Sequence, residues 1–166
     1  MDSERIVMPH EPFNIAGQVT ISLRAITKPN EPWMVVWQDH NIIPRPGQSA
    51  WLGWLLGYSV SRPGWIGLGT GAVSATSIHA SALQAEVIRK TGSYAQVVNS
   101  VSARFICKFT PTQANYRLQE IGLFNVSGTT ANMFAIASID VTKTSAYAMQ
   151  IMWSLAVLTG SALPTA

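Results

Sequence analysis

Apolar and polar side chains alternate along much of the second half of the chain, which predicts β-strands with one buried face. The last such stretch is the clearest, because Met149, Ile151, Trp153 and Leu155 all fall on one side of an extended backbone. Short polar segments rich in Asn, Gly and Thr separate the stretches and are typical of turns. The expected strands are residues 19–25, 33–37, 65–69, 94–98, 101–109, 116–124, 133–140 and 149–155.

The order of these strands favours an all-β fold. Residues 19–25 and 33–37 flank a turn-forming sequence with two prolines at residues 28–32, and should form a hairpin. Short strands with polar turns, and no helix recurring between them, indicate a mainly antiparallel β-sandwich or barrel. We expect an extended N-terminal arm at residues 1–16, a single β-rich domain at residues 17–158 and a polar C-terminal tail at residues 159–166.

A short helix is the exception to the β pattern. Pro44 and Pro46 are expected to end the segment that leaves the hairpin. Ser49 can then cap the N-terminus of a helix that stops at Gly57. Such a short helix needs a sheet to pack on, so we expect it to cover one end or edge of the β-fold. Its apolar face would comprise Trp51, Trp54, Leu55 and Tyr58.

The composition indicates a subunit of a larger assembly. Charged residues make up 11% of the chain, whereas 48% of residues are hydrophobic and six are Trp; a typical chain has about 25% charged residues. Either a membrane or extensive contact with neighbouring subunits would account for so little charge. No apolar run approaches the roughly 20 residues of a membrane-spanning helix, and residues 1–5 do not read as a secretory signal. Assembly without a membrane partner is the interpretation that fits.

The basic residues and the cysteine each exclude a class of partner. The net charge is +3, but Arg89-Lys90 is the one adjacent basic pair. A nucleic-acid-binding surface normally clusters its basic residues, so no direct nucleic-acid partner is expected. Cys107 is the single cysteine, which rules out an internal disulfide and a multi-cysteine zinc site. Its place in an alternating strand predicts a small, buried apolar side chain.

Glu120 places a carboxylate inside an apolar strand, residues 119–125, shortly before a turn that begins at Asn125. A buried carboxylate is costly unless it is paired or hydrogen-bonded. Glu120 is therefore either a catalytic group or a structural anchor. Because no second acid or nucleophile accompanies it convincingly, we expect an anchor that holds the strand at Gly122 and the turn in register.

Three arginines could neutralise Glu120, and Arg89 is the first to expect, ahead of Arg104 and Arg117. Glu86 and Arg89 are three residues apart and would meet if residues 83–90 are helical. Before that segment, residues 72–83 are rich in Ser, Thr and Ala and predict a long surface loop. The predicted anchor group is Glu86, Arg89, Glu120 and Gly122, and the predicted apolar packing residues are Trp51, Trp54, Trp65, Phe124 and Trp153.

Catalytic and cofactor motifs lack the sequence context that they need. Residues 67–72 match the letters of a G-x-G-x-x-A dinucleotide fingerprint, but a Ser/Thr/Ala-rich loop follows instead of a helix. His10, His40 and His79 have no partner at metal-ligand spacing. A spatial Ser-His-Asp triad stays open as an alternative, although the chain has no G-x-S-x-G elbow. We predict no catalytic residue, no metal site and no cofactor, and hence a protein that is not an enzyme.

Several motifs occur in an order that resembles small structural proteins of tailed bacteriophages. The resemblance covers about residues 38 to 158 and departs at Pro44, where that family usually has Val-Asn after the Asn-Leu-Ile entry. The motifs are Asn41-Ile42-Ile43 followed by Gly47, then Trp65 to Gly71, then Leu83, Glu86 and Arg89, then Glu120 to Asn125, then Met133-Phe134-Ala135, Lys143-Thr144 and Ile151 to Leu155.

The resemblance implies a virion protein that is assembled in the host bacterial cytoplasm. Such proteins serve as capsid decoration (cement) proteins or as parts of tails, baseplates and fibre roots. A compact chain favours a decoration protein, expected as a homotrimer, that bridges and stabilises subunits of the major capsid protein. A tail, baseplate or fibre-anchor subunit is the alternative, and a lectin-like host-binding module is a more remote one.

Overall fold

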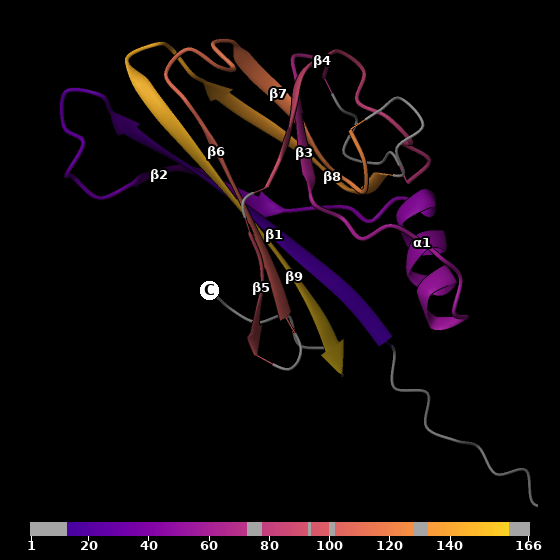
Figure 1. The fold of residues 1–166 in the computed structure, drawn as a ribbon. Helices are drawn as coiled ribbons and strands as arrows, with labels where there is room; N and C mark the ends of the chain where they lie inside the picture. Colours follow the sequence, from indigo (N-terminus) through magenta and orange to yellow (C-terminus); the bar gives the residue numbers. More distant parts are fainter. Residues whose placement is uncertain (1–12, 73–77, 93, 100–101, 128–132, 160–166) are drawn as a thin grey trace, which may run out of the picture.

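The structure is a computed structural model that describes residues 13–72, 78–92, 94–99, 102–127 and 133–159. These residues form two antiparallel β-sheets and a short helix that lies to one side of them (Figure 1). The all-β fold expected from the sequence is confirmed, and a sandwich is observed instead of a barrel.

The two sheets differ in size. Sheet A has the strand order β2-β1-β9-β6-β5, and sheet B has the order β4-β3-β7-β8. Neighbouring strands run antiparallel in both sheets. The elements are β1 (Phe13–Ala25), β2 (Met34–His40), α1 (Arg45–Leu55), β3 (Trp65–Gly69), β4 (Glu86–Thr91), β5 (Tyr94–Asn99), β6 (Ser102–Phe109), β7 (Arg117–Phe124), β8 (Met133–Thr142) and β9 (Tyr147–Thr159).

Strands β1 and β9 form the longest ladder of the fold and lie side by side in Figure 1. They pair from Phe13 opposite Thr159 to Ala25 opposite Tyr147. The expected N-terminal arm therefore ends too late, because residues 13–16 already belong to β1, where β9 supplies backbone partners. The other predicted parts of the arm and tail, residues 1–12 and 160–166, lie outside the described residues. The predicted hairpin is confirmed as β1 paired with β2.

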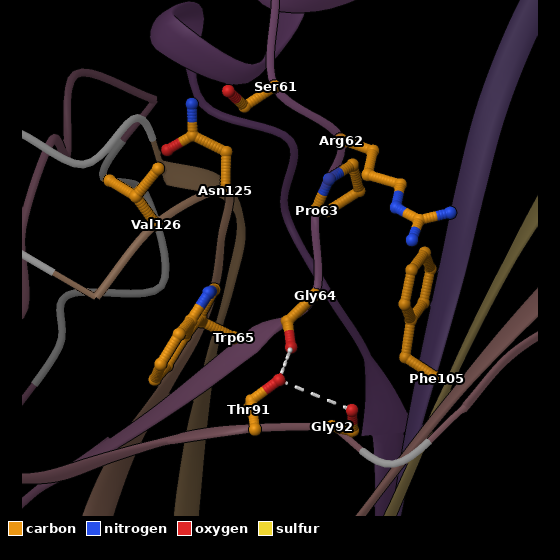
Figure 2. Close-up of a pocket in the computed structure, with 10 residues that line it drawn as sticks. All are labelled: Ser61, Arg62, Pro63, Gly64, Trp65, Thr91, Gly92, Phe105, Asn125 and Val126. Atoms are coloured by element: carbon orange, nitrogen blue, oxygen red, sulfur yellow. Dashed lines mark hydrogen bonds between the residues drawn. The ribbon is translucent and has the colours of Figure 1, made fainter.

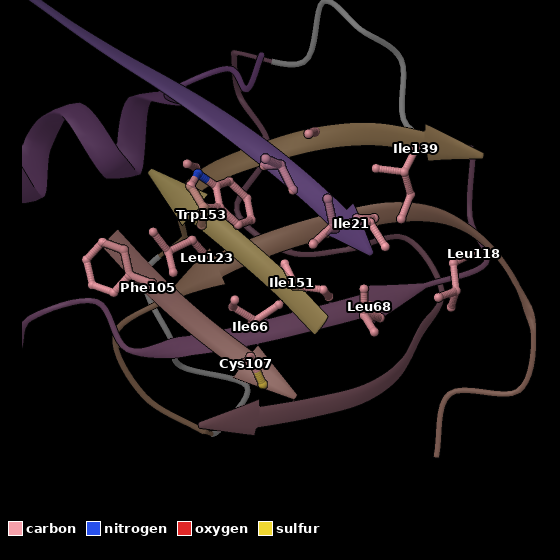
Figure 3. Packing of buried hydrophobic residues seen from close by; sticks show 14 of the residues in the cluster. Ile21, Ile66, Leu68, Phe105, Cys107, Leu118, Leu123, Ile139, Ile151 and Trp153 are labelled. Carbon is pink, nitrogen blue, oxygen red and sulfur yellow. The ribbon is translucent and has the colours of Figure 1, made fainter. Parts of the chain in front are cut away.

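The main core lies between the two sheets. The inward row predicted for β9 is confirmed, because Met149, Ile151, Trp153 and Leu155 are all buried. Figure 3 shows Trp153 and Ile151 on β9 among apolar side chains from both sheets. Cys107 is completely buried in this core, as the alternation in its strand predicts. Other members labelled in Figure 3 are Ile21, Ile66, Leu68, Phe105 and Leu123.

A second, smaller apolar cluster lies on the opposite, outer face of sheet B. It consists of Leu83, Phe124, Met133 and Ile136. The segment after β2 crosses to this sheet, where Ile42 forms an isolated bridge with Ile136. Leu83, from the connection between β3 and β4, covers part of the outer face of sheet B, and the predicted anchor residues lie on the same face.

Helix α1 begins earlier than the sequence predicts. Pro44 is its N-cap residue, in an extended conformation and without a side-chain cap, and Pro46 lies in the first turn. The prediction of Ser49 as N-cap is therefore wrong. Proline suits a first turn because the N–H groups there have no partner inside the helix. The predicted stop is confirmed, since Gly57 follows the helix with a φ of +77°.

The helix packs on the edge strand β8, as expected, through aromatic contacts. The rings of Trp51 and Trp54 meet edge to face at 4.9 Å, and the ring of Trp54 lies 5.2 Å from that of Phe134. A side chain at Gly47 would collide with the backbone carbonyl of Phe134, so this glycine permits the close approach. Tyr58, which was assigned to the same apolar face, is exposed instead.

The helix considered for residues 83–90 is wrong, because strand β4 begins at Glu86 and residues 83–85 are not helical. In its pairing with β3, Glu86 faces Gly69 and the register then slips past Val87. Val87 is thus the extra residue of a β-bulge. Residues three apart on a regular strand point to opposite sides, so the bulge is what allows the side chains of Glu86 and Arg89 to meet.

Candidate functional site

Glu120 lies in β7 with a completely buried side chain. Its Oε1 atom accepts hydrogen bonds from the backbone N–H groups of Ala85 at 2.7 Å and Gly71 at 3.2 Å. Its Oε2 atom accepts a hydrogen bond from the backbone N–H of Gln84 at 2.8 Å. Hydrogen bonds to a carboxylate are stronger than those between neutral groups. Because residues 71 and 84–85 lie at the two ends of the connection between β3 and β4, one carboxylate fastens both ends to the sheet.

Two glycines leave the space that this carboxylate occupies. Gly69 is paired with Glu120 across the sheet, and a Cβ atom added there would overlap the carboxylate. A Cβ atom at Gly71 would lie 2.8 Å from Oε1, which is also too close. The sequence that matches the letters of a dinucleotide fingerprint is therefore a strand end shaped around Glu120. Its last residues, 70–72, lie after β3 and are not helical.

The predicted pairing of Glu120 with Arg89 is wrong. The guanidinium of Arg89 binds Glu86 through two hydrogen bonds, Nε to Oε1 at 2.7 Å and Nη2 to Oε2 at 2.6 Å. Its Nη1 atom donates to the backbone carbonyl of Val126 at 3.2 Å. The contact between Glu86 and Arg89 that their spacing predicts is thus present, but the bulge at Val87 creates it and a helix does not.

The other two arginines considered as partners of Glu120 lie elsewhere. Arg117 forms an exposed ion pair with Asp140, with both N–O distances at 2.9 Å. The hydrogen bonds from Arg117 lower the pKa of Asp140. Arg104 belongs to β6 in the opposite sheet, where it pairs with Ser154 of β9. Backbone N–H groups take the place that the sequence suggested for an arginine.

Arg89 also covers the ring of Phe124, with its Cζ atom 3.6 Å from the ring centroid. Such a cation–π contact is favourable and is stronger when it is shielded from water. Beneath the ring lie Gly67 and Gly122, which are paired with each other. A Cβ atom at Gly122 would lie 2.7 Å from Cε2 of Phe124. The outer face of sheet B is therefore layered, with glycines below, the ring above them and the guanidinium on top.

This arrangement fixes a loop and leaves little room for acid–base chemistry. Both carboxylate oxygens of Glu120 are bound to backbone N–H groups in a buried site, and Glu86 is bound to Arg89. His40 and His79 are exposed, and His10 lies outside the described residues. Within the described ranges, no three His, Cys, Asp or Glu side chains are grouped so as to hold a metal ion.

The predicted packing residues belong to different parts of the molecule. Trp153 is completely buried between the sheets, whereas Phe124 is buried on the outer face of sheet B. Trp51 and Trp54 belong to α1 and are half-buried, and Trp65 is half-buried beside the second cluster. They therefore form no single surface, and Trp65 also lines a cleft.

Asn41 is the hydrogen-bond partner of the buried Trp153, a role that the sequence did not predict. The Nε1–H group of Trp153 donates to Oδ1 of Asn41 at 3.0 Å, and the backbone N–H of Asn41 donates to the carbonyl of Gly17. A side chain at Gly17 would overlap that amide group. The signal that could have found the pair is physical: a buried indole N–H usually needs an acceptor.

Lys143 is a second buried polar residue whose role the sequence did not predict. It is almost fully buried, and its Nζ atom donates to Oδ1 of Asn115 at 2.7 Å and to the carbonyl of Pro111 at 3.2 Å. Burial lowers the pKa of Lys143. The contacts tie the turn at residues 110–116 to the end of β8.

A cleft with a volume of about 380 Å³ opens at the start of β3 (Figure 2). Its walls are formed by residues 61–64, the first residue of β3, the last residue of β4 with Gly92, the turn after β7, and Phe105 of β6. The lining side chains with hydrogen-bonding or aromatic groups include Arg62, Trp65, Thr91 and Asn125. Trp65 was predicted as a packing residue alone, and no role was predicted for Arg62.

Among the described residues, four exposed large apolar side chains lie on the hairpin of β1 and β2. The exposed fractions are 52% for Ile26, 60% for Met34, 55% for Val35 and 38% for Val36. Met34 and Val35 are neighbours on a strand, so both sides of β2 carry exposed apolar groups. Strand β2 is also an edge of sheet A. Figure 1 shows the turn of this hairpin at the periphery of the molecule, on the side away from α1.

Comparison of the chain with protein-family models, with curated proteins and with solved structures found no match. In the part of the chain that the structure describes, no helix has the length and apolar character needed to span a membrane. The assignment of a function therefore rests on the surfaces and contacts described above, together with the sequence motifs.

Proposed function

We propose that this protein is a structural subunit of a bacteriophage virion, and specifically a capsid decoration protein that bridges and stabilises subunits of the major capsid protein. The observation that carries the proposal is the apolar surface of the β1–β2 hairpin, formed by Ile26, Met34, Val35 and Val36. An exposed apolar patch of this kind is typical of a surface that a partner covers. The sequence motifs supply the class of assembly.

The edge position of β2 suggests how the partner is held. An edge strand presents backbone N–H and C=O groups that another chain can pair with. Within residues 34–40 there is no Lys and no Pro, the residues that commonly block such pairing. Apolar side chains on both sides of the strand would then be buried together with the new backbone hydrogen bonds. A partner bound in this way stabilises the folded assembly by mass action.

The remainder of the fold supports a rigid presentation of that hairpin. The ladder between β1 and β9 continues through the whole length of β1, so the hairpin is anchored in the core at Ile21 and Ile151. On sheet B, Glu120 fastens both ends of the connection between β3 and β4 to the sheet. A homotrimer is part of the proposal, with each subunit contacting its neighbours and the coat protein.

Copy number and position in the particle test the proposal. In virions produced from the genome that encodes this chain, mass spectrometry should give a copy number comparable with that of the coat protein. A gold label on the chain should decorate the whole head. A small number of copies with label at the tail alone would overturn the decoration role and assign the tail, baseplate or fibre-anchor role instead.

The hairpin itself is tested by a double variant, Met34→Lys with Val35→Lys. We expect the variant to remain folded, because both side chains are exposed, and to bind particles that lack the protein at least about tenfold more weakly. The matched control is Leu52→Lys with Leu56→Lys, which changes two exposed apolar residues near α1, 59% and 69% exposed. Equal binding by the hairpin variant and the unchanged protein would exclude this surface as the docking site.

A further inference from the structure

The cleft at the start of β3 is lined by a positively charged side chain, Arg62. Arg62 is exposed and forms no ion pair or hydrogen bond with the described residues. The described residues that line the cleft include no Asp and no Glu. Nearby cations differ in this respect, since Arg89 binds Glu86 and Lys90 donates to the carbonyl of Lys108. A guanidinium of this kind suits a carboxylate, which it can bind with two parallel hydrogen bonds.

Trp65 gives the cleft an aromatic wall. The ring is half-buried, because it packs against the second apolar cluster on one side and lines the cleft on another. Figure 2 places Trp65 and Phe105 on opposite sides of Gly64. A Cβ atom added at Gly64 would meet nothing within 4 Å, so the space over this residue is open. A ligand that contacts both Trp65 and Arg62 can therefore extend across Gly64.

The remaining polar groups favour a ligand with several hydroxyl groups. The Thr91 hydroxyl lies 3.3 Å from the carbonyl of Gly92 and 3.5 Å from that of Gly64, so its hydrogen is used within the protein and its lone pairs can accept (Figure 2). Ser61 contributes a second hydroxyl and Asn125 an amide. A small number of placed polar groups beside an aromatic ring is the usual composition of a small-molecule site.

We propose that this cleft binds an acidic saccharide, with a carboxylate on Arg62 and a sugar ring against the indole of Trp65. Arg62, which no described residue pairs, balances the single negative charge of a carboxylate, whereas a phosphate monoester carries a charge of about −1.5 to −2. Sugar hydroxyls have partners in Ser61, Thr91 and Asn125. An acidic peptide would offer these three groups fewer partners. The site goes beyond the proposed role in the shell, because it adds a small-molecule ligand.

Binding is tested by NMR on the full ¹⁵N-labelled chain with two disaccharides that differ in a single group. Cellobiouronic acid carries one carboxylate, and cellobiose is its neutral counterpart. The acidic disaccharide should shift the indole N–H signal of Trp65 and the amide signals of Asn125. Cellobiose should bind about tenfold more weakly, because a charged hydrogen-bonded contact is lost.

Two arginine variants separate the cleft from general charge attraction. Arg62→Gln should remove the preference, so that the acidic and neutral disaccharides bind with similar affinity. Arg45→Gln, which removes an exposed arginine at the start of α1, should leave the preference unchanged. The proposal is overturned if neither disaccharide shifts the cleft signals, or if both variants lose the preference equally. Tighter binding of the acidic tripeptide Gly-Asp-Gly than of cellobiouronic acid would overturn the saccharide assignment.

Discussion

The Oε1 atom of Glu120 accepts a hydrogen bond from the backbone N–H of Ala85 at 2.7 Å, which joins the middle of β7 to the residue just before β4. The same oxygen holds the N–H of Gly71 at the other end of the β3–β4 connection. A buried carboxylate therefore accepts backbone hydrogen bonds that a neighbouring strand would accept in a regular sheet. It replaces the missing partners of N–H groups that would otherwise be buried without an acceptor.

Replacing Glu120 by Gln should lower the free energy of unfolding by about 1–3 kcal/mol, because one acceptor oxygen becomes a donor that faces a backbone N–H. Urea unfolding of the purified chain measures the change. The control is Glu31→Gln, which breaks an exposed ion pair with Lys28 and should cost about 0.5 kcal/mol or less. Similar losses in the two variants would show that Glu120 is not an anchor.

Gly122→Ala should destabilise the protein by about 1–3 kcal/mol, because an added methyl group cannot share the space with a buried ring. The new Cβ atom would lie 2.7 Å from Phe124, so the ring must move and its contact with Arg89 must weaken. Gly64→Ala is the matched control, since a Cβ there meets nothing within 4 Å. Thermal unfolding followed by circular dichroism compares them, and a Gly122→Ala variant as stable as the control would contradict the layered packing.

Cys107 should make the stability depend on pH in the alkaline range. Burial raises the pKa of its thiol to about 11, against the opposing effect of Lys90. Above the pKa of an unfolded thiol, roughly 8.5, the unfolded chain has lost a proton that the folded chain still holds. The unfolded state then binds fewer protons, so stability falls as the pH rises.

The measurement is urea unfolding at several pH values between 8 and 11 for the unchanged protein and for Cys107→Ala. The unchanged protein should lose about 2–3 kcal/mol more than the variant across this range. The variant starts from a lower stability because it leaves a small cavity, so the slopes are compared and not the absolute values. Parallel curves would mean that the thiol titrates normally in the folded protein.

Some features of the candidate site followed from local sequence and others did not. The meeting of Glu86 and Arg89 was predicted from their spacing, but the helix invoked for it does not exist, because Val87 bulges out of a strand. The partner of Glu120 was misassigned to a side chain. Backbone N–H groups carry no sequence signal, so no residue type could have indicated them.

The sequence by itself determined the all-β fold, the inward row of β9 from Met149 to Leu155, the burial of Cys107 and the stop of α1 at Gly57. Each of these depends on periodicity or on one residue's backbone preference, and both are local. Only the tertiary structure decided which groups surround Glu120, since its partners lie 35 to 49 residues away along the chain. Contacts over such separations depend on sheet register, and one bulge or one glycine is enough to change which groups meet.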